Sequence, residues 1–86
     1  MPTYDYAFTS KSLKQLQKLP RDVQKRILKR LDEYCANNPL KKADRLTDFR
    51  LGDYRFRIGD WRVVFDLGVD EVLIIHLVGH RRDIYR

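Results

Sequence analysis

The stretch YRFRIGDWRVVF, residues 54–65, predicts a strand, a two-residue turn at Gly59-Asp60 and a second strand. Counting outward from the turn gives four cross-strand pairs: Ile58 with Trp61, Arg57 with Arg62, Phe56 with Val63, and Arg55 with Val64. One face of this hairpin is then apolar and is expected to pack on helices: Tyr54, Phe56, Ile58, Trp61, Val63 and Phe65. The opposite face carries Arg55, Arg57, Arg62, Val64 and Asp66.

The hairpin places two positive charges against each other, because its register pairs Arg57 with Arg62. Like charges across two strands cost about half a kcal/mol, so a sequence optimised for stability alone would carry Glu or Thr at one of these positions. A bound polyanion would reverse the sign of that interaction. The alternative is that Asp60, Asp66 or Asp83 neutralises the pair. The sequence leaves both explanations open.

The sequence before the hairpin predicts one strand and two helices. Residues 3–8, TYDYAF, alternate aromatic side chains with small or polar ones, as a half-buried strand does. A short amphipathic helix follows, capped by Thr9 or Ser10 and ended by Pro20. The second helix extends to Pro39, and its apolar stripe consists of Val23, Ile27, Leu31, Tyr34 and Cys35. Residues 40–53 are mixed and polar, and we expect a connecting loop with room for a turn of helix.

The second strand of the hairpin extends to residue 67, and a third strand is predicted over residues 72–78, with a turn at residues 68–71 between them. The last run, VLIIHLV, is nearly all apolar, which is typical of a central strand covered on both faces. The order of strand, two helices and three strands favours a small α+β fold, in which both helices pack on one face of an antiparallel sheet. Eighty-six residues suffice for one modest core, so we expect a single domain over residues 1–86.

The charge balance of the chain favours an anionic partner. The net charge is +6 and the isoelectric point is about 9.7. All seven lysines precede residue 43, and every later basic residue except the histidines is an arginine. A guanidinium grips phosphate oxygens with two parallel hydrogen bonds, so this distribution indicates a C-terminal half that holds phosphate. The alternative, that arginine merely suits strands and surface ion pairs, stays open.

Several other chemistries lack support in the sequence. The lone cysteine, Cys35, cannot form an internal disulfide and lies at helical spacing from apolar residues, so we expect it in the core. Neither His76 nor His80 has a carboxylate or cysteine at ligand spacing, so no metal or other cofactor is expected. The N-terminus is polar, and no apolar run approaches the ~20 residues of a membrane span. We therefore expect a cytoplasmic protein without membrane contact.

The C-terminal residues VGHRRDIYR, 78–86, are expected to extend the arginine-bearing face. Gly79 lets the backbone turn after the last strand, which would free His80, Arg81, Arg82 and Tyr85 to lean over that face. Arginines, an imidazole and an aromatic ring for stacking together suit the handling of RNA. Each side chain also has a simpler explanation: a hydrogen bond in the turn for His80, a core anchor for Tyr85 and solvation for Arg82.

The chain resembles the RelE/ParE superfamily of bacterial and archaeal toxins, and within it the RelE-like mRNA endoribonucleases (mRNA interferases) of type II toxin-antitoxin systems. The resemblance covers nearly the whole chain and rests on the element order, KLP at the end of the first helix, DYRFRIGDWRVVF and VGHRRDIYR. It implies a toxin that enters the ribosomal A site and cleaves translated mRNA without a metal. It also implies a cognate antitoxin whose acidic or amphipathic segment wraps the toxin, with operator DNA contacted only through that complex.

In RelE-like enzymes the ribose 2′-hydroxyl attacks the adjacent phosphate, which leaves a cyclic phosphate and a free 5′-hydroxyl. The resemblance assigns stabilisation of that phosphate to Arg55, Arg57, Arg62 and Arg81. On the strand that carries Arg55 and Arg57, some RelE-like toxins have a lysine where this chain has an arginine. Because a guanidinium stays protonated, such an arginine is unsuited to act as a general base. His80 is then the candidate for proton transfer, and Tyr85 for stacking on the substrate base.

Two alternative functions share the same fold. A ParE-like toxin would inhibit DNA gyrase without cleavage, although it would have no need for a phosphate-stabilising cluster with a stacking ring. A toxin without activity would use its basic face only to dock an acidic antitoxin and to repress their operon with it. Substitution of Arg81 and Tyr85 separates these functions, since a nuclease should lose toxicity and keep its affinity for the antitoxin.

Overall fold

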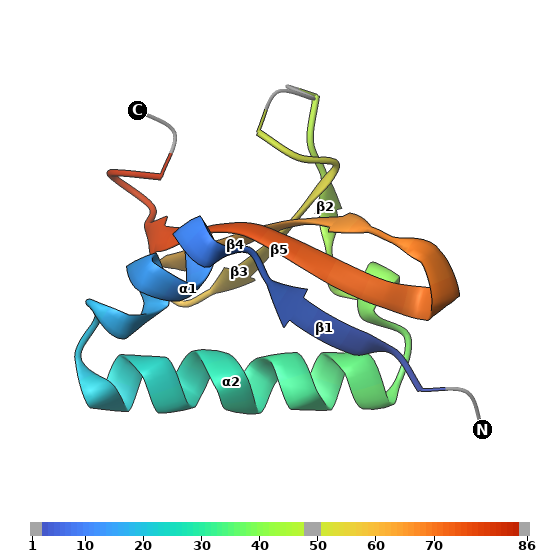
Figure 1. The fold of residues 1–86 in the computed structure, drawn as a ribbon, viewed down its shortest axis with the longest axis horizontal. Coiled ribbons are helices and arrows are strands. Elements are labelled where there is room, and N and C mark those ends of the chain that lie inside the picture. The colour runs from blue at the N-terminus through green and yellow to red at the C-terminus, as the bar shows by residue number, and fades with distance from the viewer. Residues whose placement is uncertain (1–2, 48–50, 85–86) are drawn as a thin grey trace.

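The computed structural model describes residues 3–47 and 51–84 and places one strand and two helices before a run of four strands (Figure 1). The helices are α1 (Ser10–Gln17) and α2 (Arg21–Ala36), and 3-10 turns lie at η1 (Pro39–Lys41) and η2 (Val69–Glu71). The strands are β1 (Asp5–Phe8), β2 (Asp44–Arg45), β3 (Tyr54–Ile58), β4 (Trp61–Leu67) and β5 (Val72–His80). The predicted α+β class and the predicted order of strand, two helices and hairpin are confirmed.

The five strands form one sheet in the order β1-β5-β4-β3-β2. Neighbouring strands are antiparallel except β1, which runs parallel to β5 with Asp5 opposite Val72. The predicted antiparallel sheet is confirmed in the main, and the structure adds two features: the parallel pairing of β1 and a short strand, β2, before the three predicted strands. A strand of two residues, β2, is too short to show an alternating pattern. The direction of β1 depends on a partner near the other end of the chain, which no local pattern reveals.

The core lies between the helices and one face of the sheet, as the sequence predicted (Figure 1). On α2 the buried residues are Val23, Ile27, Leu31 and Cys35, so most of the predicted stripe is confirmed. The sheet contributes fully buried side chains, among them Phe56, Val63, Phe65, Leu73 and Ile75. Burial, with smaller contributions from Asp5 and Asp32, raises the pKa of the Cys35 thiol to about 11, so Cys35 is an uncharged core residue. Within the described residues, no helix is long and apolar enough to cross a membrane.

Helix α1 takes the place of β1 beside the second half of β5. β1 pairs with β5 only as far as Ile75. Beyond this point, the buried Ser12 hydroxyl donates to the Ile75 carbonyl at 2.7 Å, and the Val78 N–H donates to Gln15 Oε1 at 2.9 Å. These side chains satisfy backbone groups that an adjacent strand would otherwise bind. The helix is thereby fixed against the sheet near the C-terminal end of β5.

The β3–β4 hairpin has the predicted register, from Ile58 opposite Trp61 to Tyr54 opposite Phe65. Gly59 has φ +61° at the first position of the turn, a conformation that glycine adopts without strain. The apolar side chains of the hairpin face the helices, as predicted, and its arginines face away from them. The turn residues and the alternation along each strand were therefore sufficient to predict this element.

Helices cover strand β5 on one face only. Its buried side chains are Leu73, Ile75 and Val78, whereas the residues between them are half-buried. The expectation of a strand covered on both faces is wrong, because both helices contribute to the same core on the same side of the sheet. The helices thus leave the second face of the sheet uncovered, although Val64, paired there with Arg55, is fully buried beside Gly52.

Replacement of Gly52 is expected to destabilise the fold. Its φ of +142° is a backbone conformation that glycine adopts readily and other residues rarely do. A Cβ atom at this position would lie 2.6 Å from Cγ1 of the fully buried Val64. We expect Gly52→Ala to lower the free energy of unfolding, measured by urea denaturation, by about 2–3 kcal/mol. Gly59→Ala is the matched control: its φ is +61°, but an added Cβ meets nothing within 4 Å, so we expect a loss of about 1 kcal/mol. Equal losses would show that close packing at Gly52 contributes nothing.

Candidate phosphate-binding site

Three arginines share the face of the sheet that points away from the helices. Arg55 and Arg57 are two residues apart on β3, so both project to this face, and Arg62 on β4 is paired directly with Arg57. The predicted opposition of two arginines is therefore confirmed. The exposed fraction of the side chain is 25% for Arg55 and 61% for Arg57, so Arg57 is the more accessible of the two.

A carboxylate that sequence reasoning missed lies beside the two β3 arginines. Asp44 on β2 is paired with Arg55, and its Oδ2 atom accepts from Arg55 Nη2 at 3.1 Å and lies 2.9 Å from Arg57 Nε. The carboxylate that neutralises Arg57 is thus none of the three considered from the sequence. No signal marked Asp44, because β2 is too short for a periodic pattern and its pairing with β3 is a tertiary contact.

Arg62 is held by backbone carbonyl groups of its own hairpin. Its Nη1 atom donates to the Gly59 carbonyl at 2.8 Å and to the Trp61 carbonyl at 2.9 Å. In the part of the chain that the structure describes, no carboxylate contacts this guanidinium. A carbonyl group carries no net charge, so these bonds orient Arg62 and leave its positive charge in place. An anion on this face would therefore be attracted to Arg62 in particular.

The turn between β3 and β4 also contacts Arg81, which follows β5. The Arg81 N–H donates to the Asp60 carbonyl at 2.8 Å, and Arg81 Nε lies 3.6 Å from Asp60 Oδ1. The buried Ile84 lies over Gly79, with its Cβ 3.9 Å from where a Gly79 Cβ would be. Gly79 is paired with Arg62. The described residues after β5 therefore fold back over the arginine-bearing face.

His80 lies on the opposite face from the arginines. β5 continues through His80, two residues beyond its predicted end, and pairs it with Trp61, whose ring it meets edge-on at a centroid distance of 5.3 Å. The expectation that His80 leans over the arginine-bearing face is therefore wrong. The Arg82 N–H donates to His80 Nδ1 at 3.2 Å, so the neutral ring carries its hydrogen on Nε2. Tyr85, the predicted stacking residue, lies outside the described residues.

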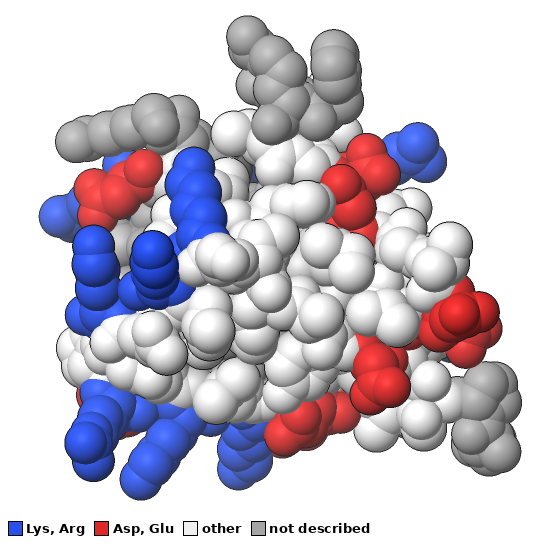
Figure 2. All heavy atoms as spheres, in the orientation of Figure 1, with Lys and Arg blue, Asp and Glu red and all other residues white. Residues whose placement is uncertain are grey.

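Positive charge gathers toward one end of the molecule. Figure 2 shows Lys and Arg side chains over the end where the β3–β4 turn, the end of β5 and the junction of the helices lie in Figure 1. Most of the visible acidic side chains lie toward the other end. We call Arg55, Arg57, Arg62 and Arg81 the arginine cluster. Among the described residues, Asp44 contacts Arg55 and Arg57, and Asp60 contacts Arg81.

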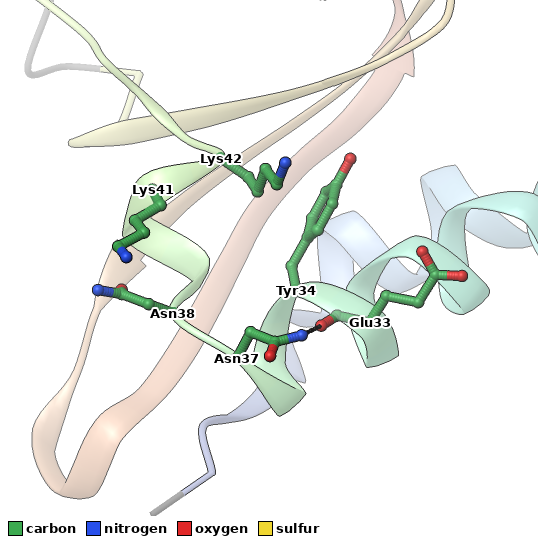
Figure 3. A pocket seen from close by; sticks show the side chains of 6 residues that line it. All are labelled: Glu33, Tyr34, Asn37, Asn38, Lys41 and Lys42. Carbon is green, nitrogen blue, oxygen red and sulfur yellow. Dashed lines mark hydrogen bonds between the residues drawn. The ribbon is translucent and has the colours of Figure 1, made fainter.

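A separate hollow lies at the C-terminal end of α2 (Figure 3). Its volume is about 290 Å³, and it is lined by Glu33, Tyr34, Asn37, Asn38, Lys41 and Lys42. Figure 3 shows the Asn37 amide turned toward the helix, where it donates to the Glu33 carbonyl at 3.1 Å. This hollow is formed by α2 and η1 and includes no residue of the arginine cluster. Among residues 3–47 and 51–84, no group of three His, Cys, Asp or Glu side chains could hold a metal ion.

Comparison with known proteins identifies relatives at the level of family and fold. Residues 6–85 match the family described as the ParE toxin of type II toxin-antitoxin system, parDE. Comparison with curated proteins finds no match.

Several solved structures have a similar fold. A chain of the toxin-antitoxin complex RelBE2 from Mycobacterium tuberculosis is 24% identical, with 96% of this chain and 97% of that chain covered and a TM-score of 0.81. A mutant of the E. coli toxin RelE in the free state is 23% identical over 96% of this chain and 90% of that chain, with a TM-score of 0.76. The archaeal RelE-RelB complex from Pyrococcus horikoshii contains a chain 27% identical over 94% of this chain and 98% of that chain, with a TM-score of 0.70. The predicted RelE-like fold is confirmed.

Proposed function

The chain belongs to the RelE/ParE superfamily of type II toxins, and on this premise we propose that it is a ribosome-dependent endoribonuclease that cleaves translated mRNA. The ribose 2′-hydroxyl attacks the adjacent phosphate and leaves a cyclic phosphate and a free 5′-hydroxyl, without a metal. The observation that carries this proposal is the direct opposition of Arg57 and Arg62. Two like charges at this spacing disfavour folding, and a phosphate bound between them turns the repulsion into attraction.

In this proposal the arginine cluster stabilises the extra negative charge of the pentavalent phosphate. Arg62 contributes most, because carbonyl groups orient its guanidinium without neutralising it. Proton transfer requires a group within hydrogen-bond reach of the reacting oxygen. His80 lies on the face opposite the arginine cluster, beside Trp61, so the proposal assigns it no proton transfer. Stacking of the substrate base on Tyr85 stays a prediction.

We also propose a cognate antitoxin as the cellular partner of this chain in the cytoplasm. The support is that similar chains are part of toxin-antitoxin complexes, among them RelBE2 and the archaeal RelE-RelB complex. The net charge of +6 suits an acidic or amphipathic antitoxin segment that wraps the toxin. Operator DNA would be contacted only through that complex, and no membrane is involved.

Inhibition of DNA gyrase without cleavage is the second candidate function. The family match favours it, because the matching family is described as the ParE toxin. An inhibitor of this kind acts by occupying a surface of its target and has no transition state to stabilise. The opposed arginines then have no catalytic purpose, and single alanine substitutions in the arginine cluster would change gyrase inhibition only as far as they change affinity.

Primer extension on a defined mRNA, with and without translating ribosomes, tests the proposal. We expect the unchanged protein to cleave only when ribosomes are present. Arg81→Ala should lower that cleavage about 10- to 100-fold, because it removes one charge that stabilises the phosphate, although the side chain is 54% exposed. Arg30→Ala, which removes an exposed arginine paired with Glu33 on α2, should leave cleavage unchanged. Absence of cleavage in both conditions, together with inhibition of supercoiling by gyrase, would replace this function with the second candidate.

A further inference from the structure

Asp44 connects the edge of the sheet to the arginine cluster. It lies on β2, and its pairing with Arg55 places it on the arginine-bearing face. A single oxygen, Oδ2, lies 3.1 Å from Arg55 Nη2 and 2.9 Å from Arg57 Nε. The exposed fraction of the Asp44 side chain is 36%, so both contacts are partly shielded from water. One carboxylate thus contacts both arginines of β3.

The contact with Arg57 uses the nitrogen nearest to the side-chain stem. A guanidinium bound through Nε keeps its two terminal nitrogens as a fork, and this fork matches two oxygens of a phosphate. Arg57 is 61% exposed, so without a partner its long side chain would sample many rotamers. Asp44 holds the fork on the face that Arg57 shares with Arg62. Its negative charge also offsets part of the repulsion between these two arginines.

We propose that Asp44 is a positioning residue for mRNA cleavage that acts through Arg57, an inference that rests on the endoribonuclease function proposed above. Its role is to hold the Arg57 guanidinium where the scissile phosphate binds. A carboxylate at this place could have two other roles, and each predicts a different result. A competitor of the phosphate would slow the unchanged protein, so its removal would raise cleavage. A general base would be needed whether or not Arg57 is present.

A double-mutant cycle separates these roles. Cleavage of a defined mRNA on translating ribosomes is measured with toxin in excess for the unchanged protein, Asp44→Ala, Arg57→Ala and the double variant. We expect each single substitution to lower the maximal cleavage rate about tenfold, and the double variant to be no slower than Arg57→Ala. The toxin concentration that gives half the maximal rate should not rise in Asp44→Ala, because removal of a negative charge does not weaken attraction to RNA.

Two further variants control for charge and for shape. Asp44→Asn keeps a polar side chain of the same shape beside Arg57 but loses the negative charge, so its rate should lie between those of the unchanged protein and Asp44→Ala. Glu33→Ala removes a carboxylate that is paired with Arg30 at 3.1 Å on α2. It changes the net charge by the same amount as Asp44→Ala and should leave cleavage unchanged. Thermal unfolding of every variant establishes that the compared proteins are folded.

Three results would overturn the proposal. A rate for Asp44→Ala equal to or above that of the unchanged protein would show that Asp44 is unnecessary or competes with the phosphate. A further loss in the double variant below Arg57→Ala would show that Asp44 acts independently of Arg57. Absence of cleavage by the unchanged protein would overturn the endoribonuclease function itself, and with it the role of Asp44. The first two results both require that the unchanged protein cleaves mRNA, so they are distinct from this outcome.

Discussion

Arg62→Ala is expected to lower ribosome-dependent cleavage about 10²- to 10³-fold, the largest effect of any single substitution in the arginine cluster. Both Arg57 and Arg81 have a carboxylate nearby, whereas Arg62 is held by the Gly59 and Trp61 carbonyl groups. Its guanidinium is therefore oriented before the substrate binds and keeps its full charge for the pentavalent phosphate. Arg62→Lys should recover only part of the activity, because an ammonium group lacks the planar fork that contacts carbonyl and phosphate together.

The stability of Arg62→Ala distinguishes loss of catalysis from loss of structure. Removal of one of two opposed positive charges should leave the free energy of unfolding unchanged or raise it by about 0.5 kcal/mol, although cleavage falls. Primer extension on translating ribosomes gives the cleavage rate, and urea denaturation gives the stability. Arg30→Ala, on the far side of the core, is the matched control. Cleavage by Arg62→Ala within threefold of the unchanged protein would contradict the assignment of Arg62 to the phosphate.

Phe56→Ala is expected to lower the free energy of unfolding by about 3–5 kcal/mol, since it leaves a large cavity in the core. Phe56 is fully buried and stacks on Phe65 at a centroid distance of 4.5 Å and against Tyr34 at 4.8 Å. A chain of 86 residues has a total stability of about 4–13 kcal/mol, so this loss would consume a large part of it. Urea denaturation followed by circular dichroism measures the change.

The conservative variant Phe56→Leu is the control for the core prediction. It keeps most of the apolar volume beside Phe65, so we expect a loss below about 1.5 kcal/mol. A loss below 1 kcal/mol in Phe56→Ala itself would mean that the core closes around the gap, and the packing described for Phe56, Phe65 and Tyr34 would then not be what stabilises the hairpin.

The two predictions concern neighbouring strands of one hairpin and yet separate function from stability. Successive side chains of a strand point to opposite faces, so Phe56 enters the core while Arg55 and Arg57 remain on the accessible face. The exposed arginines of the second face contribute little to stability, and the opposition of Arg57 and Arg62 even reduces it. A sheet covered by helices on one side only can carry such a charged cluster without disturbing its core.

Local patterns in the sequence were sufficient for the elements whose geometry is local. The turn at Gly59-Asp60 and the alternation on both sides of it fixed the hairpin register, and hence the opposition of Arg57 and Arg62. The α2 stripe was equally predictable, because a helical period of 3.6 residues is visible in a short window. The resemblance to RelE/ParE toxins added the expected fold, which the structure confirms.

Contacts between distant segments were decided only by the tertiary structure. The parallel pairing of β1 with β5 joins the two ends of the chain, and the contact of Asp44 with Arg57 requires β2 to pair with β3. The face on which His80 lies depends on how far β5 continues beside β4, since one more residue of strand reverses the side to which a side chain points. The sequence by itself therefore determined which residues form the hairpin and that its arginines face one another. Only the folded sheet determined which carboxylate holds Arg57 and where the histidine points, because these depend on pairings that no local period encodes.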